Sequence, residues 1–402
     1  MEATELTNKL REACQGRISA VRVLARLQPT GGKGDKVFPP TYEGGKYHEE
    51  KRLADGEVID VVVLDSVQSQ ANRFEETLAR AFEAGECDIP IVKVTLPNHE
   101  PVTSLTAPHR IHDAIFRDSL LEGQPFRQSD LGQRIVNARV ANATAFYEIC
   151  PTVLIFGAWD SHGGGGVNSA KIPRALTSEI VGLRAERGNR TASRIDPLGI
   201  ERGNRTIYKH PTDFWTFNEN EAVKDEKGKP VPFGKEGKSG KPSAIGHGNV
   251  TPNVSEFGGV TISEAVQTTL LSFVQLRRLR FPDDSNNASV ERDVAGRSVI
   301  AALALYAITL QLEAGYDLRS RCSLLPIEPP RFEFVGPTSG EIESFSLTKD
   351  VAKRVFDGLR EQAARVGLRW RSPITELTPS EKLTELVRRS EKLTETAEEE
   401  QV

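Results

Sequence analysis

The stretch FGAWDSHGGGGVNSAKIPRALTSEIVG, residues 156–182, decides the fold assignment, because an apolar run, a glycine turn and a basic arm meet there. The apolar run, residues 152–156, predicts a short buried strand. The turn contains Gly163, Gly164, Gly165 and Gly166, whose backbone can approach a phosphate closely. It lacks the Gly-Lys-Ser/Thr ending of a P-loop and the glycine spacing of a dinucleotide site. The glycine turn can therefore be interpreted in three ways: as a contact with a polymeric phosphate, as a nucleotide site or as a plain flexible turn.

The basic arm follows this turn and covers residues 171–209. It has nine lysines and arginines against four acids, a net charge of +5, whereas the whole chain has a net charge of −4. The hexapeptide ERGNRT occurs in the arm twice, at residues 186–191 and 201–206. Each copy offers two guanidinium groups and an amide, at intervals suited to successive phosphates. The arm therefore predicts binding to a nucleic-acid backbone, and a solvated charged surface is the alternative.

A strand followed by a helix is predicted before the turn. Residues 57–65 are a β-branched run typical of a buried strand, and residues 67–84 have apolar side chains at helical spacing. Ser66 is the expected N-cap of that helix, whose first turns are unusually polar. Exposed amides at a helix N-terminus are natural anion sites. Further strands are expected at residues 18–27 and 89–96, and helices at residues 109–121 and 130–149.

The chain after the arm begins with a segment rich in Gly, Lys, Pro and Ser, residues 218–253, which predicts a mobile loop or insertion. Helices are then expected at residues 290–314 and 348–366, and closing strands at residues 319–325 and 331–335. Strands and helices thus alternate irregularly. This order favours an α+β fold with helices on one side of a sheet, and a split βαβ, ferredoxin-like core fits it.

The overall composition, 38% hydrophobic and 27% charged, is that of a folded soluble protein. The cysteines, at positions 14, 87, 150 and 322, lack the close pairing of a disulfide framework or a zinc site, so a reducing cytoplasm is expected. The N-terminus has no apolar core, which predicts the absence of a signal peptide. The apolar stretch at residues 299–312 is shorter than the ~20 residues that span a bilayer, and it predicts a core helix and no membrane partner.

Catalytic and metal sites are not expected. Asp160 and His162 flank Ser161 in one loop, and three residues of one loop cannot form a triad with each other. His109 and His112 are three residues apart, a spacing that fits a metal-binding pair or a polar helix face. The other histidines are scattered. We therefore expect no catalytic residue, no metal and no cofactor.

Four motifs together resemble a known family. They are SQANRFE at residues 69–75, FGAWDSHGGGG at residues 156–166, KIPRALTSEIVG at residues 171–182 and LRRLRFP at residues 276–282. In combination they are similar to the backbone subunit of type I-U (also called I-G) CRISPR effector complexes, the seventh Cas family and a member of the RAMP superfamily. The resemblance covers roughly residues 17–335. Residues 218–253 and the acidic tail, residues 373–402, lie outside its recognisable motifs.

The resemblance implies an RRM/ferredoxin-like core with a long inserted thumb and helical additions. Copies of the subunit would polymerise along a CRISPR RNA (crRNA) in a helical filament and present its spacer for pairing with target DNA. Other effector-complex subunits would join them, and a separate helicase-nuclease would cut the target. The implied organisation is an RNA-binding domain at residues 1–335 with its flexible insertion at 218–253, a helical addition at 336–372 and an acidic tail at 373–402.

The RNA-binding role falls on the turn, the arm and the polar start of the helix. A scaffold that reads no sequence needs cations and exposed amides more than contacts with base edges. The residues expected to contact RNA are Gln68, Ser69, Asn72, Arg73, Gly163, Gly164, Gly165, Gly166, Lys171, Arg174, Arg184, Arg187, Arg190, Arg202 and Arg205. The alternative function is a RAMP-type, metal-dependent endoribonuclease that uses Asp160 and His162. A structural subunit that assembles through protein contacts alone is a third class.

Overall fold

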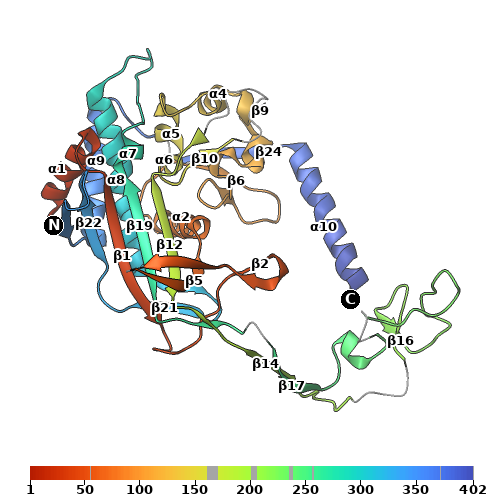
Figure 1. Ribbon diagram of the computed structural model, residues 1–402. Helices are drawn as coiled ribbons and strands as arrows, with labels where there is room; N and C mark the ends of the chain where they lie inside the picture. The colour runs from red at the N-terminus through yellow and green to blue at the C-terminus, as the bar shows by residue number, and fades with distance from the viewer. Residues whose placement is uncertain are drawn as a thin grey trace. The chain divides into compact units, whose positions relative to one another are not determined.

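Two units make up the chain in the computed structural model, which describes residues 1–54, 56–160, 171–200, 206–234, 239–255, 258–371 and 373–401. The larger unit contains Met1–Glu186 and Val260–Thr384, and the smaller one contains Arg187–Gly259 and Glu385–Val402. Figure 1 shows the order of the elements along the chain. All four cysteines are free, in agreement with the lack of a disulfide pattern in the sequence, and all four are buried.

A large antiparallel sheet forms the centre of the larger unit. Among the described residues it has nine strands, in the order β20-β21-β1-β19-β12-β5-β4, with β22 paired to β1 and β23 paired to β22. Neighbouring strands run antiparallel. The strands are β1 (Ala20–Pro29), β4 (Glu49–Ala54), β5 (Glu57–Asp65), β12 (Leu176–Leu183), β19 (Glu264–Ser272), β20 (Tyr316–Arg319), β21 (Cys322–Pro326), β22 (Arg331–Val335) and β23 (Ile342–Phe345).

Four of these strands have the order of an RNA recognition motif. Along the chain they come as β1, β12, β19 and β22, whereas across the sheet they lie as β22, β1, β19 and β12. Helix α2 (Val67–Glu83) lies in the connection from β1 to β12, and α8 (Val290–Ala314) lies in the connection from β19 to β22. This is the βαββαβ topology of the ferredoxin-like fold. The predicted α+β fold class is therefore confirmed.

The second half of strand β5, residues 61–64, is apolar without interruption because both of its faces are covered there. Val62 and Leu64 lie in one buried cluster with residues of β1, β20 and β21. Val61 and Val63 lie in a second cluster, which also includes Ile59 and Val181. Burying each such side chain is worth about 1.5–3 kcal/mol. The strand therefore holds Asp65, its last residue, in a fixed position at its end.

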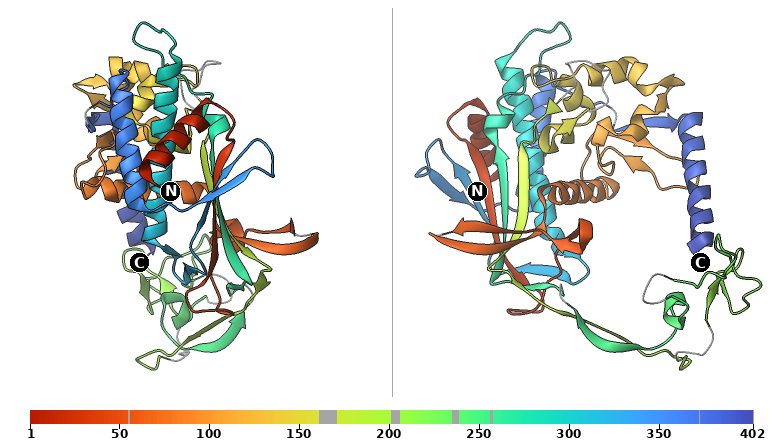
Figure 2. Two further views of the ribbon diagram at one scale, coloured as in Figure 1. Left: turned by 90° about the vertical axis from the view of Figure 1, so that its left-hand side faces the viewer. Right: turned by 45° about the vertical axis from the view of Figure 1, so that its right-hand side comes forward.

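Helices α2 and α8 contact each other, and α8 also contacts α1 (Ala3–Gln15) and α9 (Lys349–Arg365). Figure 2 shows α1, α8 and α9 beside one another along the sheet. Helix α8 begins after Ser289, whose side chain accepts a hydrogen bond from the Arg292 amide. By length and composition it is the one helix of the described chain that could cross a membrane, yet its apolar window is entirely buried in the protein. It is the core helix that the sequence predicts.

Four local predictions are wrong. The strand predicted at residues 319–325 is instead the end of β20, a turn and most of β21, and these two strands pair with each other. Residues 152–156, predicted as a strand, form helix α6 (Thr152–Phe156), because a short buried apolar run does not distinguish a strand from a helix. The helix predicted at residues 130–149 is divided into α4 (Asp130–Val136) and α5 (Thr144–Ile149) by a turn in which Arg139 and Asn142 pair. The helix predicted at residues 109–121 is instead a short series of elements: η2 (Arg110–His112), α3 (Ala114–Arg117) and β8 (Ser119–Leu121).

A smaller sheet contains a strand from the acidic tail. Five strands of the described chain form it in the order β7-β6-β24-β8-β9, and β24 (Ile374–Pro379) pairs in parallel with β6 (Ile91–Val94). After β24 the tail forms α10 (Glu381–Gln401). The other elements of the larger unit are β2 (Thr41–Tyr42), η1 (Glu43–Gly45), β3 (Lys46–Tyr47), β7 (Val102–Thr103), β9 (Gln124–Pro125), η3 (Phe126–Gln128), β10 (Ala158–Trp159), β11 (Lys171–Ile172), β18 (Val260–Thr261) and α7 (Phe273–Leu276).

The smaller unit includes the insertion between β12 and β19. The family resemblance predicts a long thumb inserted into the RRM-like core, and this insertion is in the position of that thumb. A two-stranded ribbon of β14 (Arg190–Arg194) and β17 (Val250–Ser255) forms one part of it. A second ribbon joins β15 (Tyr208–Lys209) to β16 (Trp215–Thr216). The described parts of residues 218–253 contain η4 (Pro242–Ile245). Strand β13 (Glu186–Arg187) leads into the unit.

Candidate functional site

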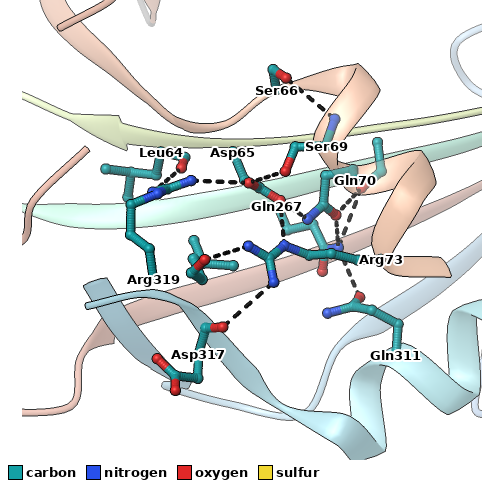
Figure 3. A network of polar contacts seen from close by, with 12 residues as sticks. Leu64, Asp65, Ser66, Ser69, Gln70, Arg73, Gln267, Gln311, Asp317 and Arg319 are labelled. Carbon is teal, nitrogen blue, oxygen red and sulfur yellow. Dashed lines mark hydrogen bonds and ion pairs between the residues drawn. The ribbon is translucent and has the colours of Figure 1, made fainter. Parts of the chain in front are cut away.

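Asp65 is the centre of a polar network at the end of β5. Its side chain is fully buried and accepts hydrogen bonds from four donors. The donors are Ser69 Oγ at 2.7 Å, Gln70 Nε2 at 2.6 Å, Arg73 Nε at 2.8 Å and Arg319 Nη2 at 3.2 Å. Because α2 starts directly after the strand, capped by the Ser66 side chain, its first two turns face back toward the carboxylate (Figure 3). Asp65 therefore fixes the start of α2 relative to the sheet.

The two arginines of this network also hold backbone carbonyls. Arg73 Nη2 donates to Leu318 O at 2.5 Å, and Arg319 Nη1 donates to Leu64 O at 2.7 Å. Gln70 Oε1 accepts from Ser178 Oγ at 2.9 Å and from Gln267 Nε2 at 2.7 Å, which ties α2 to β12 and β19. Ser69 and Arg73, expected to contact RNA, thus have partners within the protein. RNA contact by these two side chains stays a prediction.

Four other residues that were expected to contact RNA lie together in a cleft. Gln68 and Asn72 on α2 line it with Lys171 and Arg174, the first cations of the basic arm. The cleft has a volume of about 590 Å³. The other lining residues are Pro108, His109, Arg110, Phe156, Gly157, Ala158, Trp159, Ile172 and Pro173. The cleft thus combines cations, amides and an indole, which are groups that can bind an anionic polymer with aromatic bases.

A buried ion pair supports the floor of the cleft. Arg110 donates from Nε to Glu75 Oε1 at 2.6 Å and from Nη2 to Glu75 Oε2 at 2.8 Å, and both side chains are buried. Burial raises the pKa of Glu75 to about 7, against the opposing effect of the Arg110 charge. Arg110 Nη1 also donates to Gly157 O at 3.2 Å, so the pair holds the backbone on which the cleft is built.

Arg174 is held by the same segment. Its Nε donates to Phe156 O at 3.2 Å. Partial burial and the nearby charge of Arg110 lower the pKa of Arg174, which means that they destabilise its charged form. An anion bound beside the guanidinium would offset this destabilisation. The guanidinium is therefore fixed on one side, and its remaining N–H groups suit an anionic ligand.

Gly157 allows this close arrangement, and its replacement by alanine is expected to lower the free energy of unfolding by about 2–3 kcal/mol. Its φ of +80° and ψ of 163° are reached almost only by glycine, and an added Cβ would lie 2.9 Å from both Arg174 Cγ and Ile172 O. Gly123→Ala is the matched control, since its φ is +82° but the space around it is open. Chemical denaturation measures both variants, and equal losses would contradict the steric part of this account.

The other described cations of the basic arm do not line the cleft. Arg184 forms an exposed ion pair with Glu57, 2.8 Å from Nη2 to Oε2. Arg187 and Arg190, in β13 and β14, are exposed residues of the smaller unit. Gly163, Gly164, Gly165, Gly166, Arg202 and Arg205 lie outside the described residues. RNA contacts by the residues of this paragraph stay predictions.

The endoribonuclease alternative depends on Asp160, which is buried. Arg127 Nη2 donates to Asp160 Oδ1 at 2.8 Å, and His112 Nδ1 lies 3.9 Å from Asp160 Oδ2. His162 lies outside the described residues. In the described part of the chain no group of three or more His, Cys, Asp or Glu side chains is placed to hold a metal ion. The Asp160 carboxylate is thus used within the fold.

His112 makes stability depend on pH. Burial lowers the pKa of His112 to about 4, although the Asp160 charge opposes this effect. Below pH 6.5 the unfolded chain takes up a proton at this residue before the folded protein does, so stability falls as the pH decreases toward 4. The expected loss is about 3 kcal/mol.

Denaturant unfolding between pH 7 and pH 4 measures this effect in the wild type and in two variants, His112→Gln and His109→Gln. His112→Gln is expected to remove this part of the pH dependence. His109→Gln, which changes an exposed histidine three residues away, should retain it. Parallel stability curves for the wild type and His112→Gln would contradict the assignment.

Two features of the site were missed from the sequence alone. The Glu75–Arg110 pair joins residues 35 positions apart, a separation that no local pattern reveals. The Asp65 network has a weak local signal, since Ser69 and Arg73 follow the strand's last residue at helical spacing, four and eight positions later. That signal can be read as an internal cap or as an anion site, and the structure shows the internal cap.

The comparison with protein families gives a match over less than half of the chain, within its N-terminal part. Residues 21–187 match the family described as CRISPR-associated protein GSU0053. This segment is therefore similar to a CRISPR-associated protein family. It contains three of the four motifs that carried the resemblance and all the residues that line the cleft. The resemblance to a CRISPR-associated family is thereby confirmed.

Other comparisons add little. Among curated protein sequences nothing matches this chain. Among solved structures, the crystal structure of Thermofilum pendens Csc2 matches at 12% sequence identity, over 89% of this chain and 80% of that chain, with a TM-score of 0.25. So low a score supports no inference, and the fold assignment depends on the strand order described above.

Proposed function

We propose that this CRISPR-associated chain is a crRNA-binding backbone subunit of a type I surveillance complex. The observation that carries the proposal is the cleft in which Gln68, Asn72, Lys171 and Arg174 meet, within the segment that matches the CRISPR-associated family. Exposed amides and cations bind a ribose-phosphate backbone whatever its sequence. The subunit would polymerise along the spacer and present it for pairing with target DNA.

The proposed partners follow from this role. A copy bound to each segment of RNA would contact the next copy head to tail, and a repeated contact of this kind produces a helical filament. Other subunits of the effector complex would bind the ends of the filament, and a helicase-nuclease would be recruited to cut the target. The proposal requires no cofactor and no membrane, and it places the protein in the cytoplasm.

The experiment separates a scaffold from an enzyme and from a protein-only subunit. Purified protein is incubated with end-labelled RNA in the presence of Mg²⁺, and the RNA is then examined for cleavage. Light scattering gives the mass of the protein with and without that RNA. A scaffold is expected to leave the RNA intact and to form larger particles only when RNA is present. Cut RNA that persists in an Asp160→Asn variant would indicate a contaminating nuclease, whereas cleavage lost in that variant would support the endoribonuclease.

A further inference from the structure

The cleft contains one large exposed apolar side chain. Trp159 is 62% exposed, whereas Phe156 and Ile172, which also line the cleft, are buried. It is the only exposed large hydrophobic residue among those that line the cleft in the described chain. Its indole therefore offers a flat π-face to whatever molecule enters.

A positive charge stands beside this indole. In the ribbon of β10 and β11, Trp159 is the partner of Lys171, and Ala158 is the partner of Ile172. Side chains that oppose each other in such a ribbon have Cβ atoms about 4.5–5.5 Å apart. Arg174, three residues after Lys171, lines the same cleft. A ligand that stacks on the indole would therefore have two cations near it, an arrangement that suits an aromatic ring carrying a phosphate.

Two amides complete the site. Gln68 and Asn72 are four residues apart on α2, and both are exposed and line the cleft. The structure gives neither side chain a hydrogen-bond partner among the described residues. A carboxamide both donates and accepts, so it can pair with the edge of any base or with a ribose hydroxyl. The volume of about 590 Å³ lies within the range of small-molecule sites.

Building on the proposed function, we propose that this cleft is a nucleobase pocket. The Trp159 indole stacks on one base of the bound RNA, Gln68 and Asn72 bond the edge of that base or its ribose, and Lys171 and Arg174 hold the adjoining phosphates. Stacking accepts every base, because each has a π-face. The pocket thus adds affinity without adding sequence preference.

A protein partner fits the cleft less well. Protein–protein interfaces have an apolar centre from which charged residues are depleted. Around Trp159 the described lining has cations and amides but no second exposed large apolar side chain, and Pro108, Ala158 and Pro173 add only small apolar surfaces. Contact with another protein is therefore an outcome of the test and not the proposal.

The test compares two single-stranded RNAs of equal length, one with bases and one abasic at every position, so that the phosphates and riboses are the same. Their affinities are measured by mobility shift for the wild type, Trp159→Ala, Trp159→Phe and Trp215→Ala. Trp215 belongs to the smaller unit and is the matched aromatic control. Thermal unfolding shows whether each variant is folded, and Trp159→Ala is expected to be, since its side chain is exposed.

The wild type and Trp215→Ala should bind the RNA with bases about 5- to 150-fold more tightly than the abasic RNA. Trp159→Ala should lose most of this preference, Trp159→Phe should retain much of it, and the salt dependence should not change. A wild type that binds both RNAs equally, or a Trp159→Ala variant that keeps the preference, would overturn the pocket and leave the RNA scaffold standing. Binding to neither RNA would overturn both proposals. A Trp159→Ala variant that keeps the preference but changes self-association would assign the indole to a protein contact.

Discussion

Replacing Asp65 with alanine is expected to lower the free energy of unfolding by about 3–5 kcal/mol. The side chain is fully buried and accepts hydrogen bonds from Ser69, Gln70, Arg73 and Arg319. Its removal leaves the partly buried guanidinium groups of Arg73 and Arg319 without their carboxylate, and the loss of the partner of a charge shielded from water is what makes the effect large. Denaturant unfolding followed by circular dichroism measures the change.

Asp60→Ala is the matched control for this prediction, because Asp60 lies on the same strand and forms an exposed ion pair with Lys51 at 2.9 Å. Exposed pairs contribute about 0–1 kcal/mol, so this variant should be nearly as stable as the wild type. If Asp65→Ala cost no more than Asp60→Ala, the network would not hold α2 to the sheet. The position of Gln68 and Asn72 would then need another explanation.

The second large effect is expected on RNA binding. Changing both Lys171 and Arg174 to alanine should weaken binding at least about 100-fold, because each can form a charge-assisted hydrogen bond to a phosphate. The loss should be similar for every RNA sequence, and the slope of log affinity against log salt should become shallower by about 2. A mobility shift at several salt concentrations measures both quantities.

Arg388→Ala combined with Arg389→Ala controls for the change in net charge. Both arginines lie on α10, where they form exposed ion pairs with Glu385. Their removal takes away the same charge at a distance in sequence from the cleft residues, and it should change the affinity much less. Because Arg174 also donates to Phe156 O, thermal unfolding should confirm that the cleft variant is folded. Equal losses in the two double variants would show that the cleft has no special role.

The parts of the fold that were predicted correctly have strong local signals. Strand β5 is rich in β-branched residues, α2 has a serine cap and apolar spacing, and α9 begins at Lys349 after its cap Thr348. Helix α6 was predicted as a strand because its five residues are all buried and therefore show no periodicity. Local pattern thus identifies an element when one of its faces is polar or when it is long.

The candidate site was predicted in part, for a related reason. Residue type alone selected Gln68, Asn72, Lys171 and Arg174, and the structure brings them to one cleft. Residue type also selected Ser69 and Arg73, which lie on the same helix and bind Asp65 instead. The difference depends on which face of α2 meets the sheet. The apolar spacing indicates which face packs on the protein, but Ser69 and Arg73 flank that face, and only the tertiary structure shows that they meet Asp65.

The most direct test of the RNA scaffold is a mobility shift across a salt series, with an RNA that contains a CRISPR repeat and a scrambled RNA of equal length, while the RNA is checked for cleavage. The account predicts tight, stepwise shifts that are nearly the same for both RNAs, weaken as salt increases and leave the RNA intact. The absence of any shift at low salt would contradict it, and the family resemblance would then describe a fold without RNA binding.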